Sequence, residues 1–219
     1  MEHINAQSLL SSLDEVKLLI IDRKIDVLCV SETWLQANTP DSYVDIPNYK
    51  IFRCDNGRGA GVCIYVHSAL NPSVINLDVP RTTGVEDVWV KIQYRKWPAI
   101  IIGCVYRHPK ALATSFDYIQ DIFRMVCLRD KSVFILGDFN DDIMTMGNKI
   151  SKMIKNNKLT QIIDKPTRTT STSATLLDLI ITNKPDVIVS QDVVPQVIAD
   201  HDLVSVVLNV RKPRENCLW

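Results

Sequence analysis

The sequence predicts an α/β (α+β) fold in which two β-sheets pack together and helices lie outside them. Strand-like apolar runs are numerous and unevenly spaced, and only three segments have helical periodicity, which argues against a repeating strand–helix–strand barrel. Hydrophobic residues make up 46% of the 219 residues and charged residues 23%, the balance of a globular domain with a sizeable core. We expect one domain over residues 1–210 and a basic, proline-containing tail at 211–219 outside the core.

In the N-terminal part, a helix, a strand and a hairpin are predicted in that order. Apolar residues recur at spacings of four, three and four in the predicted helix, namely at Leu9, Leu13, Val16 and Ile20, with Ser11 or Ser12 as its cap. Residues 26–30 are typical of a short buried strand. Strand-like runs at 49–54 and 61–66 flank Asn56-Gly57 and Gly59, which predicts a hairpin.

The central and C-terminal parts add further strands and two helices. Strand candidates lie at 74–79, 88–94 and 100–106. An apolar stripe predicts a helix over 114–128, and its members are Phe116, Ile119, Ile122/Phe123 and Val126. A short buried strand at 133–136 and a helix over 146–156 follow. The C-terminal third returns to strands at 177–182, 187–189, 193–198 and 203–210.

Bulk charge gives no support for nucleic-acid binding. Lysine and arginine number 25, as do aspartate and glutamate, so the formal net charge is zero, whereas nucleic-acid binders are usually basic. An enzyme that gathers carboxylates around a metal would offset its own basic rim, which makes neutrality tolerable. No apolar run has the length of a membrane span and MEHINAQSLL lacks a signal-peptide pattern, so we expect an intracellular protein that enters no membrane.

The cysteine pattern indicates neither a disulfide framework nor a zinc site. Six cysteines lie at positions 29, 54, 63, 104, 127 and 217, without a Cys-x-x-Cys pair or histidines at ligand spacing. Four of them lie in or beside apolar strand-like runs. We therefore expect reduced cysteines in the core.

Polar side chains lie at the ends of the predicted strands. They are Glu32; Tyr106 and Arg107; Asp138 and Asn140; Asp178; and Asp200 with His201. Each has an ordinary explanation on its own, since Gly-Asp-Phe-Asn at 137–140 suits a turn and an isolated Glu32 suits the solvated end of a strand. Acids and amides at five strand ends, with a histidine and a tyrosine, together suit metal and phosphate chemistry. Their oxygen ligands favour Mg²⁺, or Mn²⁺ in its place, over zinc.

Asp178 is the hardest of these residues to explain as a surface group. It interrupts the apolar run at 176–181, and burying a polar group without partners costs about 2–7 kcal/mol. His201 can be the partner, because a carboxylate behind a histidine fixes the tautomer and the charge of the ring. We therefore predict an Asp178–His201 pair.

The ordered set of motifs resembles the endonuclease/exonuclease/phosphatase superfamily. The order is Asn5, Ser31-Glu32-Thr33, Tyr106-Arg107, Gly137-Asp138-Phe139-Asn140, Asp178 and Asp200-His201. Five segments within it resemble the apurinic-like endonuclease of non-LTR (LINE-type) retrotransposons: Ser-Glu-Thr-Trp-Leu at 31–35, Val-Tyr-Arg-His-Pro at 105–109, Gly-Asp-Phe-Asn at 137–140, Pro-Thr-Arg at 166–168 and Leu-Asp-Leu-Ile-Ile-Thr-Asn at 177–183. The resemblance covers residues 4–210 and implies a four-layer α/β sandwich, two packed mixed sheets flanked by helices.

The resemblance implies a Mg²⁺-dependent DNA endonuclease that nicks double-stranded DNA and leaves a 3′-hydroxyl. In that family the 3′-hydroxyl primes reverse transcription, so a reverse-transcriptase domain in the same polyprotein and action in the nucleus are expected. Two alternatives stay open: a superfamily enzyme acting on inositol phosphates or sphingolipid, and a binding module that has lost catalysis. The intact set of polar residues argues against the second.

On the metal side, the resemblance implies that Glu32 holds Mg²⁺, with Asn5 and Gln7 nearby and Asp200 beside it. Gln7 departs from the pattern of DNA-repair relatives, which carry an aspartate at this place. An amide thus replaces a carboxylate, and we expect weaker or shifted metal binding. Few residues precede Asn5, so the first strand is expected to be short.

On the phosphate side, the resemblance implies that Asp138 orients and deprotonates the attacking water. Asn140 positions the water and the phosphate. His201, fixed by Asp178, stabilises the charge that grows in the transition state. Tyr106 contacts the phosphate or assists the leaving group.

Candidate DNA contacts are separate from the residues given metal-side and phosphate-side roles. The resemblance gives Arg107 the role of gripping the backbone, while Arg168 and Thr169 directly precede the segment that holds Asp178. Lysines also recur every third residue along and just beyond the predicted 146–156 helix, at Lys149, Lys152, Lys155 and Lys158. Such a row is more often a solvated helix face than a DNA track, and we favour the solvated face.

Overall fold

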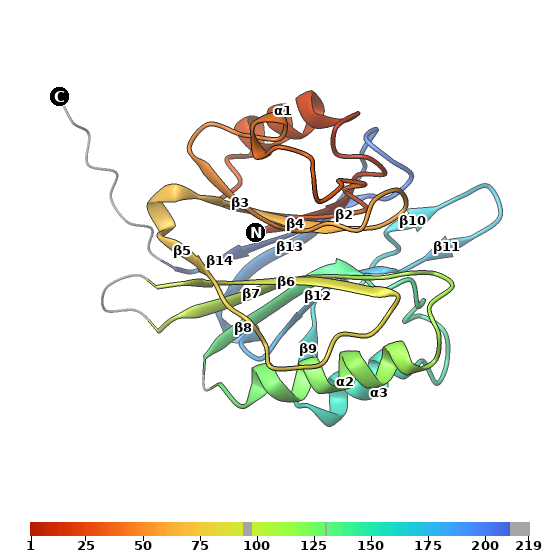
Figure 1. Ribbon diagram of the computed structural model, residues 1–219. Coiled ribbons are helices and arrows are strands. Elements are labelled where there is room, and N and C mark those ends of the chain that lie inside the picture. Colours follow the sequence, from red (N-terminus) through yellow and green to blue (C-terminus); the bar gives the residue numbers. More distant parts are fainter. Residues whose placement is uncertain (94–97, 130, 211–219) are drawn as a thin grey trace.

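A computed structural model of the chain describes residues 1–93, 98–129 and 131–210. Two six-stranded sheets pack face to face, with α1 (Leu13–Arg23) outside one sheet and α2 (Thr114–Cys127) and α3 (Lys149–Asn156) outside the other (Figure 1). The predicted four-layer sandwich of two mixed sheets flanked by helices is confirmed.

The first sheet carries the N-terminal strand near its centre. Its order is β13 (Ile188–Val194), β14 (Leu203–Leu208), β1 (Glu2–Asn5), β2 (Val27–Ser31), β4 (Val62–His67) and β3 (Tyr49–Cys54). The β1–β2 pair is parallel, and the remaining pairs are antiparallel. The predicted hairpin is present as β3–β4, and β1 is as short as expected.

The second sheet mixes parallel and antiparallel pairs in the same way. Its order is β5 (Pro72–Val74), β6 (Val85–Ile92), β7 (Ile100–Arg107), β8 (Ser132–Asp138), β12 (Asp178–Thr182) and β9 (Thr160–Gln161), with β7–β8 as the parallel pair. A separate hairpin of β10 (Arg168–Thr169) and β11 (Ala174–Thr175) projects beside the sandwich (Figure 1).

The helices use one apolar face each to cover the sheets. In α1, Val16 and Ile20 are buried, as their spacing predicts. Ser12 lies at the N-cap position, but its hydroxyl donates to the Ser8 carbonyl at 3.0 Å instead of capping the helix. The part of the chain that the structure describes also has 3₁₀ turns at Asp41–Tyr43, Ser68–Leu70 and Pro185–Val187. No helix in the described ranges is long and apolar enough to cross a membrane.

Packing on the α2 face of the second sheet depends on one glycine. A Cβ atom on Gly103 of β7 would lie 2.3 Å from the Trp89 ring of β6, so only glycine leaves room for the indole. Cys29, Cys63 and Cys104 are fully buried, and all five cysteines in the described part of the chain are free, as expected. Cys217 lies outside the described residues.

Several predicted boundaries differ from the observed ones. The strand predicted at 74–79 ends at Val74, and residues 75–79 continue as a loop. The strands predicted at 187–189 and 193–198 form the single strand β13, which has a register shift between Ile188 and Ser190 and ends before Pro195. Proline has no N–H to donate to a ladder. Tyr94 and the predicted tail at 211–219 lie outside the described residues.

Candidate active site

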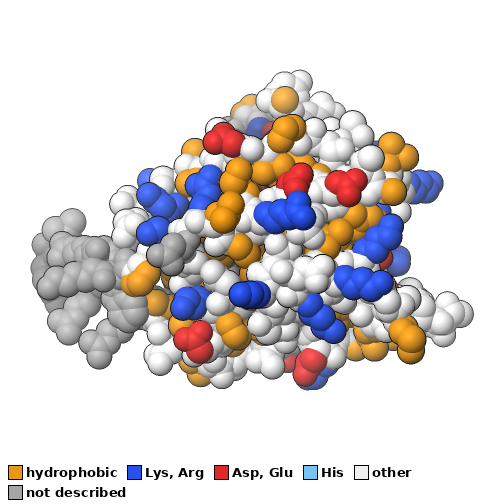
Figure 2. Space-filling view, turned by 90° about the horizontal axis from the view of Figure 1, so that it is seen from below, with side chains coloured by type: hydrophobic (Ala, Val, Ile, Leu, Met, Phe, Trp, Pro, Cys, Tyr) orange, Lys and Arg blue, Asp and Glu red, His pale blue; other side chains and the backbone are white. Residues whose placement is uncertain are grey.

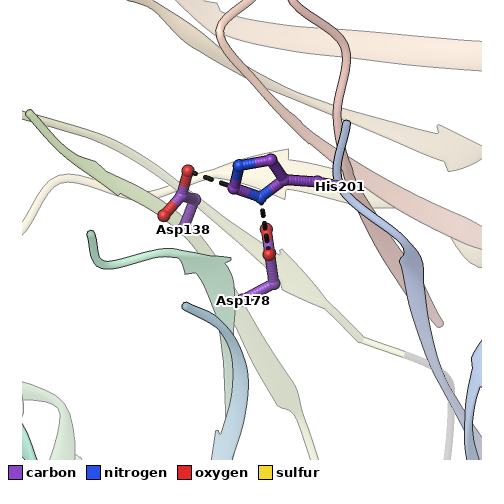
Figure 3. Close-up of side chains that lie close together, drawn as sticks. All are labelled: Asp138, Asp178 and His201. Atoms are coloured by element: carbon purple, nitrogen blue, oxygen red, sulfur yellow. Dashed lines mark hydrogen bonds and ion pairs between the residues drawn. The ribbon is translucent and has the colours of Figure 1, made fainter. Parts of the chain in front are cut away.

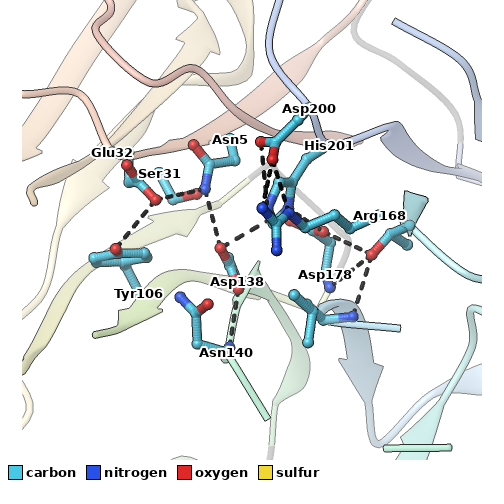
Figure 4. Close-up of polar contacts among 12 residues, drawn as sticks. Asn5, Ser31, Glu32, Tyr106, Asp138, Asn140, Arg168, Asp178, Asp200 and His201 are labelled. Atoms are coloured by element: carbon cyan, nitrogen blue, oxygen red, sulfur yellow. Dashed lines mark hydrogen bonds and ion pairs between the residues drawn. The ribbon is translucent and has the colours of Figure 1, made fainter. Parts of the chain in front are cut away.

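Polar side chains from both sheets meet at one end of the sandwich. The ends of β1 and β2 bring Asn5 and Glu32, while β8 and β12 bring Asp138 and Asp178 (Figure 4). The segment before β14 supplies His201. Parallel neighbours end at the same edge, and β1–β2 and β7–β8 are the two parallel pairs of the sandwich. The topology therefore gathers these residues in one place.

The Asp178–His201 pair is buried at the back of the site. His201 Nδ1 lies 2.7 Å from Asp178 Oδ2, and the two side chains are 5% and 0% exposed (Figure 3). Burial alone would lower the pKa of His201, but the charges of Asp178, Asp138 and Asp200 raise it to about 9. The ring is therefore a cation at neutral pH, and its Nε2 lies 3.9 Å from Asp200 Oδ1.

Asp138 is fully buried directly across the strand pair from Asp178. Its Oδ2 accepts from Asn5 Nδ2 at 3.0 Å, and its Oδ1 accepts from the Asn140 backbone N–H at 2.9 Å. Burial, with the nearby Asp178 charge, raises the pKa of Asp138 to about 7. A carboxyl group with that pKa can exchange a proton near neutral pH.

Gly137 is required immediately before Asp138. A Cβ atom at Gly137 would lie 1.8 Å from the Val105 carbonyl oxygen of the neighbouring strand β7. Glycine therefore lets β8 approach β7 closely while its last residue turns into the site. Gly137 and Asp138 belong to the strand, so the Gly-Asp-Phe-Asn segment is a strand end and not only a turn.

Asn140 and Arg107 form a rigid support beneath Asp138. Asn140 has a positive φ of 44°, and its Nδ2 donates to the Arg107 carbonyl at 2.9 Å. The Arg107 guanidinium is only 6% exposed and donates to Ser115 Oγ and to the carbonyl oxygens of Ala111 and Asn140. It is therefore committed to protein groups and is not available to grip a DNA backbone.

Glu32 stands at the opposite wall, on the first sheet. Its Oε1 accepts from Asn5 Nδ2 at 2.9 Å and from the Tyr106 hydroxyl at 3.1 Å, and its Oε2 accepts from Trp34 Nε1 at 3.2 Å. Burial and the nearby Glu32 and Asp138 charges raise the pKa of Tyr106, so the hydroxyl stays protonated and donates. Asn5 donates to both carboxylates and so connects Glu32 with Asp138.

A more exposed cluster lies on the outer side of the site. Asp200 is 41% exposed; its Oδ1 accepts from Gln7 Nε2 at 2.6 Å, and its Oδ2 accepts from Arg168 Nε and Nη2 at 2.8 and 2.6 Å. Partial burial acts to raise the pKa of Asp200, but Arg168 and His201 hold it below its usual value. Thr169, next to Arg168 on the β10–β11 hairpin, is exposed.

Sequence reasoning gave His3 no role and named Thr167 only within the Pro-Thr-Arg segment, yet both lie behind Asp178. The Thr167 hydroxyl donates to Asp178 Oδ2 at 2.7 Å, and Thr167 itself is buried. His3 is fully buried, with Nδ1 3.5 Å from Asp178 Oδ1 and Nε2 3.1 Å from Ser31 Oγ. The alternation of a strand offered one signal for His3, because it lies two residues before Asn5 and so on the same face.

The donor set at this site fits a hard divalent cation. Ligand atoms of Asp138, Asp178 and His201 lie within 4.8 Å of one another. Because the His201 ring is a cation, the donors are the carboxylates of Asp138 and Asp178, with that of Glu32 across the site. Asp138 and Asp178 sit directly opposite each other on β8 and β12, where like charges repel and a nearby cation would relieve the repulsion. Oxygen donors of this kind suit Mg²⁺ or Mn²⁺.

The lysine row lies in a different part of the molecule. Lys149, Lys152, Lys155 and Lys158 are all exposed, while Ile150 and Ile154 anchor α3 to the core. Figure 2 views the sandwich from the side on which α2 and α3 lie in Figure 1, and its Lys and Arg side chains are interspersed with acidic and apolar ones. This arrangement is typical of a solvated outer face.

Two sheets that gather carboxylates, amides and a charged histidine at one end define a class of metal-dependent phosphoester-cleaving enzymes. The sequence pattern of the endonuclease/exonuclease/phosphatase family matches residues 3–201. The chain belongs to this family, and it is an enzyme of the phosphodiesterase and nuclease class. Comparison with curated protein sequences found no match.

Solved structures share the whole fold at low sequence identity. An AP endonuclease from Archaeoglobus fulgidus aligns with a TM-score of 0.74 at 15% identity, covering 95% of this chain and 98% of that one. The endonuclease domain of TRAS1, a telomere-specific non-LTR retrotransposon, aligns with a TM-score of 0.71 at 17% identity, covering 96% and 98%. A 3′ phosphatase from Neisseria, solved with a product DNA hairpin, aligns with a TM-score of 0.72 at 13% identity, covering 95% and 98%.

Proposed function

We propose that the chain is a Mg²⁺-dependent endonuclease that nicks double-stranded DNA and leaves a 3′-hydroxyl, as non-LTR retrotransposon endonucleases do. The observation that carries the proposal is the network centred on Asn5, whose amide donates to Glu32 of the first sheet and to Asp138 of the second. Asn5 thus links Glu32 on the metal side with Asp138 on the phosphate side, and His201 Nδ1 lies 3.9 Å from Asp138 Oδ2, so the two sides border one space. One phosphodiester can reach both.

Glu32 would hold the metal ion, because its carboxylate is oriented by three donors and lies at the site's more open wall. Mg²⁺ bound there supplies positive charge for the scissile phosphate and for the leaving 3′ oxygen. Gln7 and Asp200 stand on the same outer side, already bonded to each other. We assign them to the surroundings of the ion, where the Gln7 amide fixes Asp200 without adding charge.

Asp138 accepts the proton of the attacking water. Its two oxygens are held by Asn5 and by the Asn140 backbone, which aims the remaining lone pairs into the site. A pKa of about 7 suits a base that works at neutral pH. The Asn140 side chain is anchored on the Arg107 carbonyl, so Asn140 positions the water and phosphate from a fixed backbone.

His201 is the donor for the phosphate in the transition state. Its Nδ1 is committed to Asp178, which leaves Nε2 as the second donor of the cationic ring. A preorganised cation at the point where negative charge grows is worth more in a buried site than in water. Tyr106 contributes by holding Glu32, and its protonated hydroxyl can also assist the leaving oxygen.

Arg168 and Thr169 are the proposed contacts to the DNA backbone. Both lie on the projecting β10–β11 hairpin, and the Arg168 side chain is 40% exposed beside the site. An arginine that already pairs with Asp200 through two nitrogens has the fork geometry that also fits a phosphate. Arg107 is left out because its guanidinium is buried.

The test is nicking of supercoiled plasmid by the purified protein with Mg²⁺, with Mn²⁺ and with a chelator. Conversion to the open circle should require the cation, and a polymerase should extend the nick without prior end repair, because the end is a 3′-hydroxyl. Sequencing the nick sites then gives the target preference. Asn5→Ala removes the amide that links Glu32 with Asp138, and this variant should nick far more slowly.

A matched assay separates this proposal from the lipid or inositol phosphodiesterase alternative. Inositol phosphates and a sphingolipid are offered under the same conditions as the plasmid. Hydrolysis of these small substrates with no plasmid nicking would overturn the DNA proposal while keeping the metal chemistry. In the retrotransposon setting, a reverse-transcriptase domain of the same polyprotein would extend the 3′-hydroxyl, and the action would be nuclear.

A further inference from the structure

His3 is a second buried histidine that lies against Asp178, after His201. The side chain is 0% exposed and bridges the two sheets, from Ser31 on β2 to Asp178 on β12. Within the described structure, His3 Nδ1 and Asp178 Oδ1 are both buried without another hydrogen-bond partner, and they face each other at 3.5 Å. Buried polar atoms of this kind normally find a partner.

We propose that His3 is a positioning residue that holds the Asp178 carboxylate in the orientation that His201 requires. This inference rests on the proposed function for its effect on rate, though not for its structural content. Asp178 Oδ2 is already taken by Thr167 and His201. His3 Nδ1 faces the remaining oxygen, Oδ1, at 3.5 Å, and a hydrogen bond there would commit both oxygens and keep the carboxylate turned toward His201.

The chemistry of the surroundings selects one tautomer for His3. The His3 ring is fully buried, which disfavours a charge on it, and a neutral ring carries one N–H. A proton on Nδ1 donates toward the Asp178 carboxylate, and Nε2 then accepts from the Ser31 hydroxyl at 3.1 Å. The other tautomer would point the Nδ1 lone pair at the carboxylate.

The placement of His3 on β1 gives the two opposed carboxylates one donor each. His3 and Asn5 are two residues apart, so they share a face of the strand, and both reach across to the second sheet. Asn5 donates to Asp138, and His3 faces Asp178, which is the cross-strand neighbour of Asp138. One short strand thus orients both acids of the site.

Two substitutions separate the two ring nitrogens. The amide nitrogen of His3→Asn can occupy the place of Nδ1 and keep a donor toward Asp178, whereas His3→Gln places its amide near Nε2 and loses that donor. We expect His3→Gln to lower kcat about 10-fold, the lower end for groups that orient a catalytic ligand, with KM nearly unchanged. His3→Asn should recover most of the rate. Ile122→Val, a core change in α2, controls for a general loss of stability.

A double-mutant cycle tests whether His3 acts through Asp178. In an Asp178→Asn background, His3→Gln should slow nicking less than about two-fold, because the carboxylate it orients is gone. A full additional loss in that background would overturn the inference. So would equal rates for the wild type and His3→Gln with the proteins equally folded.

A readout without activity keeps the inference separate from the proposed function. The chain has four histidines, so ¹⁵N-histidine spectra can be assigned by substituting them one at a time. At pH 7 we expect His3 to show a protonated Nδ1 and a bare Nε2, and His3→Gln to shift the Nδ1 proton signal of His201. A protonated Nε2 with a bare Nδ1 would refute the positioning role, whether or not the protein nicks DNA.

Discussion

Two carboxylate–cation pairs lie next to each other in the site and differ mainly in burial. His201 and Asp178 are 2.7 Å apart and almost fully buried, whereas Arg168 and Asp200 are 2.6 Å apart and about two-fifths exposed. Similar distances therefore do not mean similar roles. In the interior a charge must keep its partner, while near water the same contact is weak and can be exchanged for another anion.

Under the proposed function, this difference also divides the tasks of the site. The buried pair holds a cationic ring in one orientation, which is what stabilising a transition state requires. The exposed pair keeps an arginine beside the site, from which it can move to a phosphate of the substrate. The predictions below test this division, from the largest expected effect to the smallest.

Removing one partner from each pair should have very different effects on stability. Asp178→Ala leaves a buried cation and the Thr167 hydroxyl without their acceptor, and should lower the free energy of unfolding by about 3–5 kcal/mol. Arg168→Ala breaks a partly exposed pair and should cost about 0.2–1 kcal/mol. Urea denaturation at pH 7 measures both, and losses of equal size would remove the distinction.

The same contrast applies to catalysis. His201→Ala should lower the nicking rate at least about 10²-fold, the scale for one preorganised transition-state donor. Arg168→Ala is the matched change in the exposed pair, and it should raise KM more than it lowers kcat. Near-normal nicking by His201→Ala would contradict the role assigned to the buried pair.

The pH dependence of nicking should report both sides of the buried site. Asp138 acts as a base only when it is deprotonated, and its raised pKa of about 7 means that the rate climbs as the pH rises toward 7. His201 acts as a cation, and its pKa of about 9 means that the rate falls above pH 9. A bell-shaped profile is expected between these limits, and His201→Gln should lose the upper limb. A flat profile from pH 5 to 10 would contradict both assignments.

The smallest effect concerns the salt dependence of DNA binding. Each phosphate contact that is lost should reduce the slope of log affinity against log salt by about 0.9. We expect Arg168→Gln to reduce the slope by about that amount. Replacing Lys152 and Lys155 by glutamine should leave the slope unchanged, because these lysines are exposed on α3, outside the second sheet. A flatter slope for the lysine variant would make α3 a DNA-binding surface.

Gln7 adds a third residue to the exposed pair, on the side of the site where we place the metal ion. Its amide occupies Asp200 Oδ1 at 2.6 Å, so the exposed pair forms a three-residue cluster with a single negative group. An aspartate at this position would put two carboxylates side by side and could not donate to Asp200. The amide therefore lets the Asp200–Arg168 pair form without repulsion from a second carboxylate.

Much of the fold was readable from periodicity and strand ends. The spacing of Val16 and Ile20 predicted the buried face of α1, and the Asn56-Gly57 segment predicted the β3–β4 hairpin. Those signals depend on residues close together in the chain, so they can be recognised from the sequence alone. Short strands such as β10 and β11 carry no such signal, since two residues cannot show a period and their pairing depends on the neighbouring chain.

The sequence by itself determined which groups stand at the strand ends, including the pairing of Asp178 with His201, because a carboxylate in an apolar run requires a partner. Tertiary structure alone decided that Arg107 is buried, that Arg168 pairs with Asp200, and that His3 faces Asp178 across 175 positions of sequence. These contacts join segments that only sheet packing brings together. The burial of each side chain and its distance from its partners set its charge and its availability, and both depend on that packing.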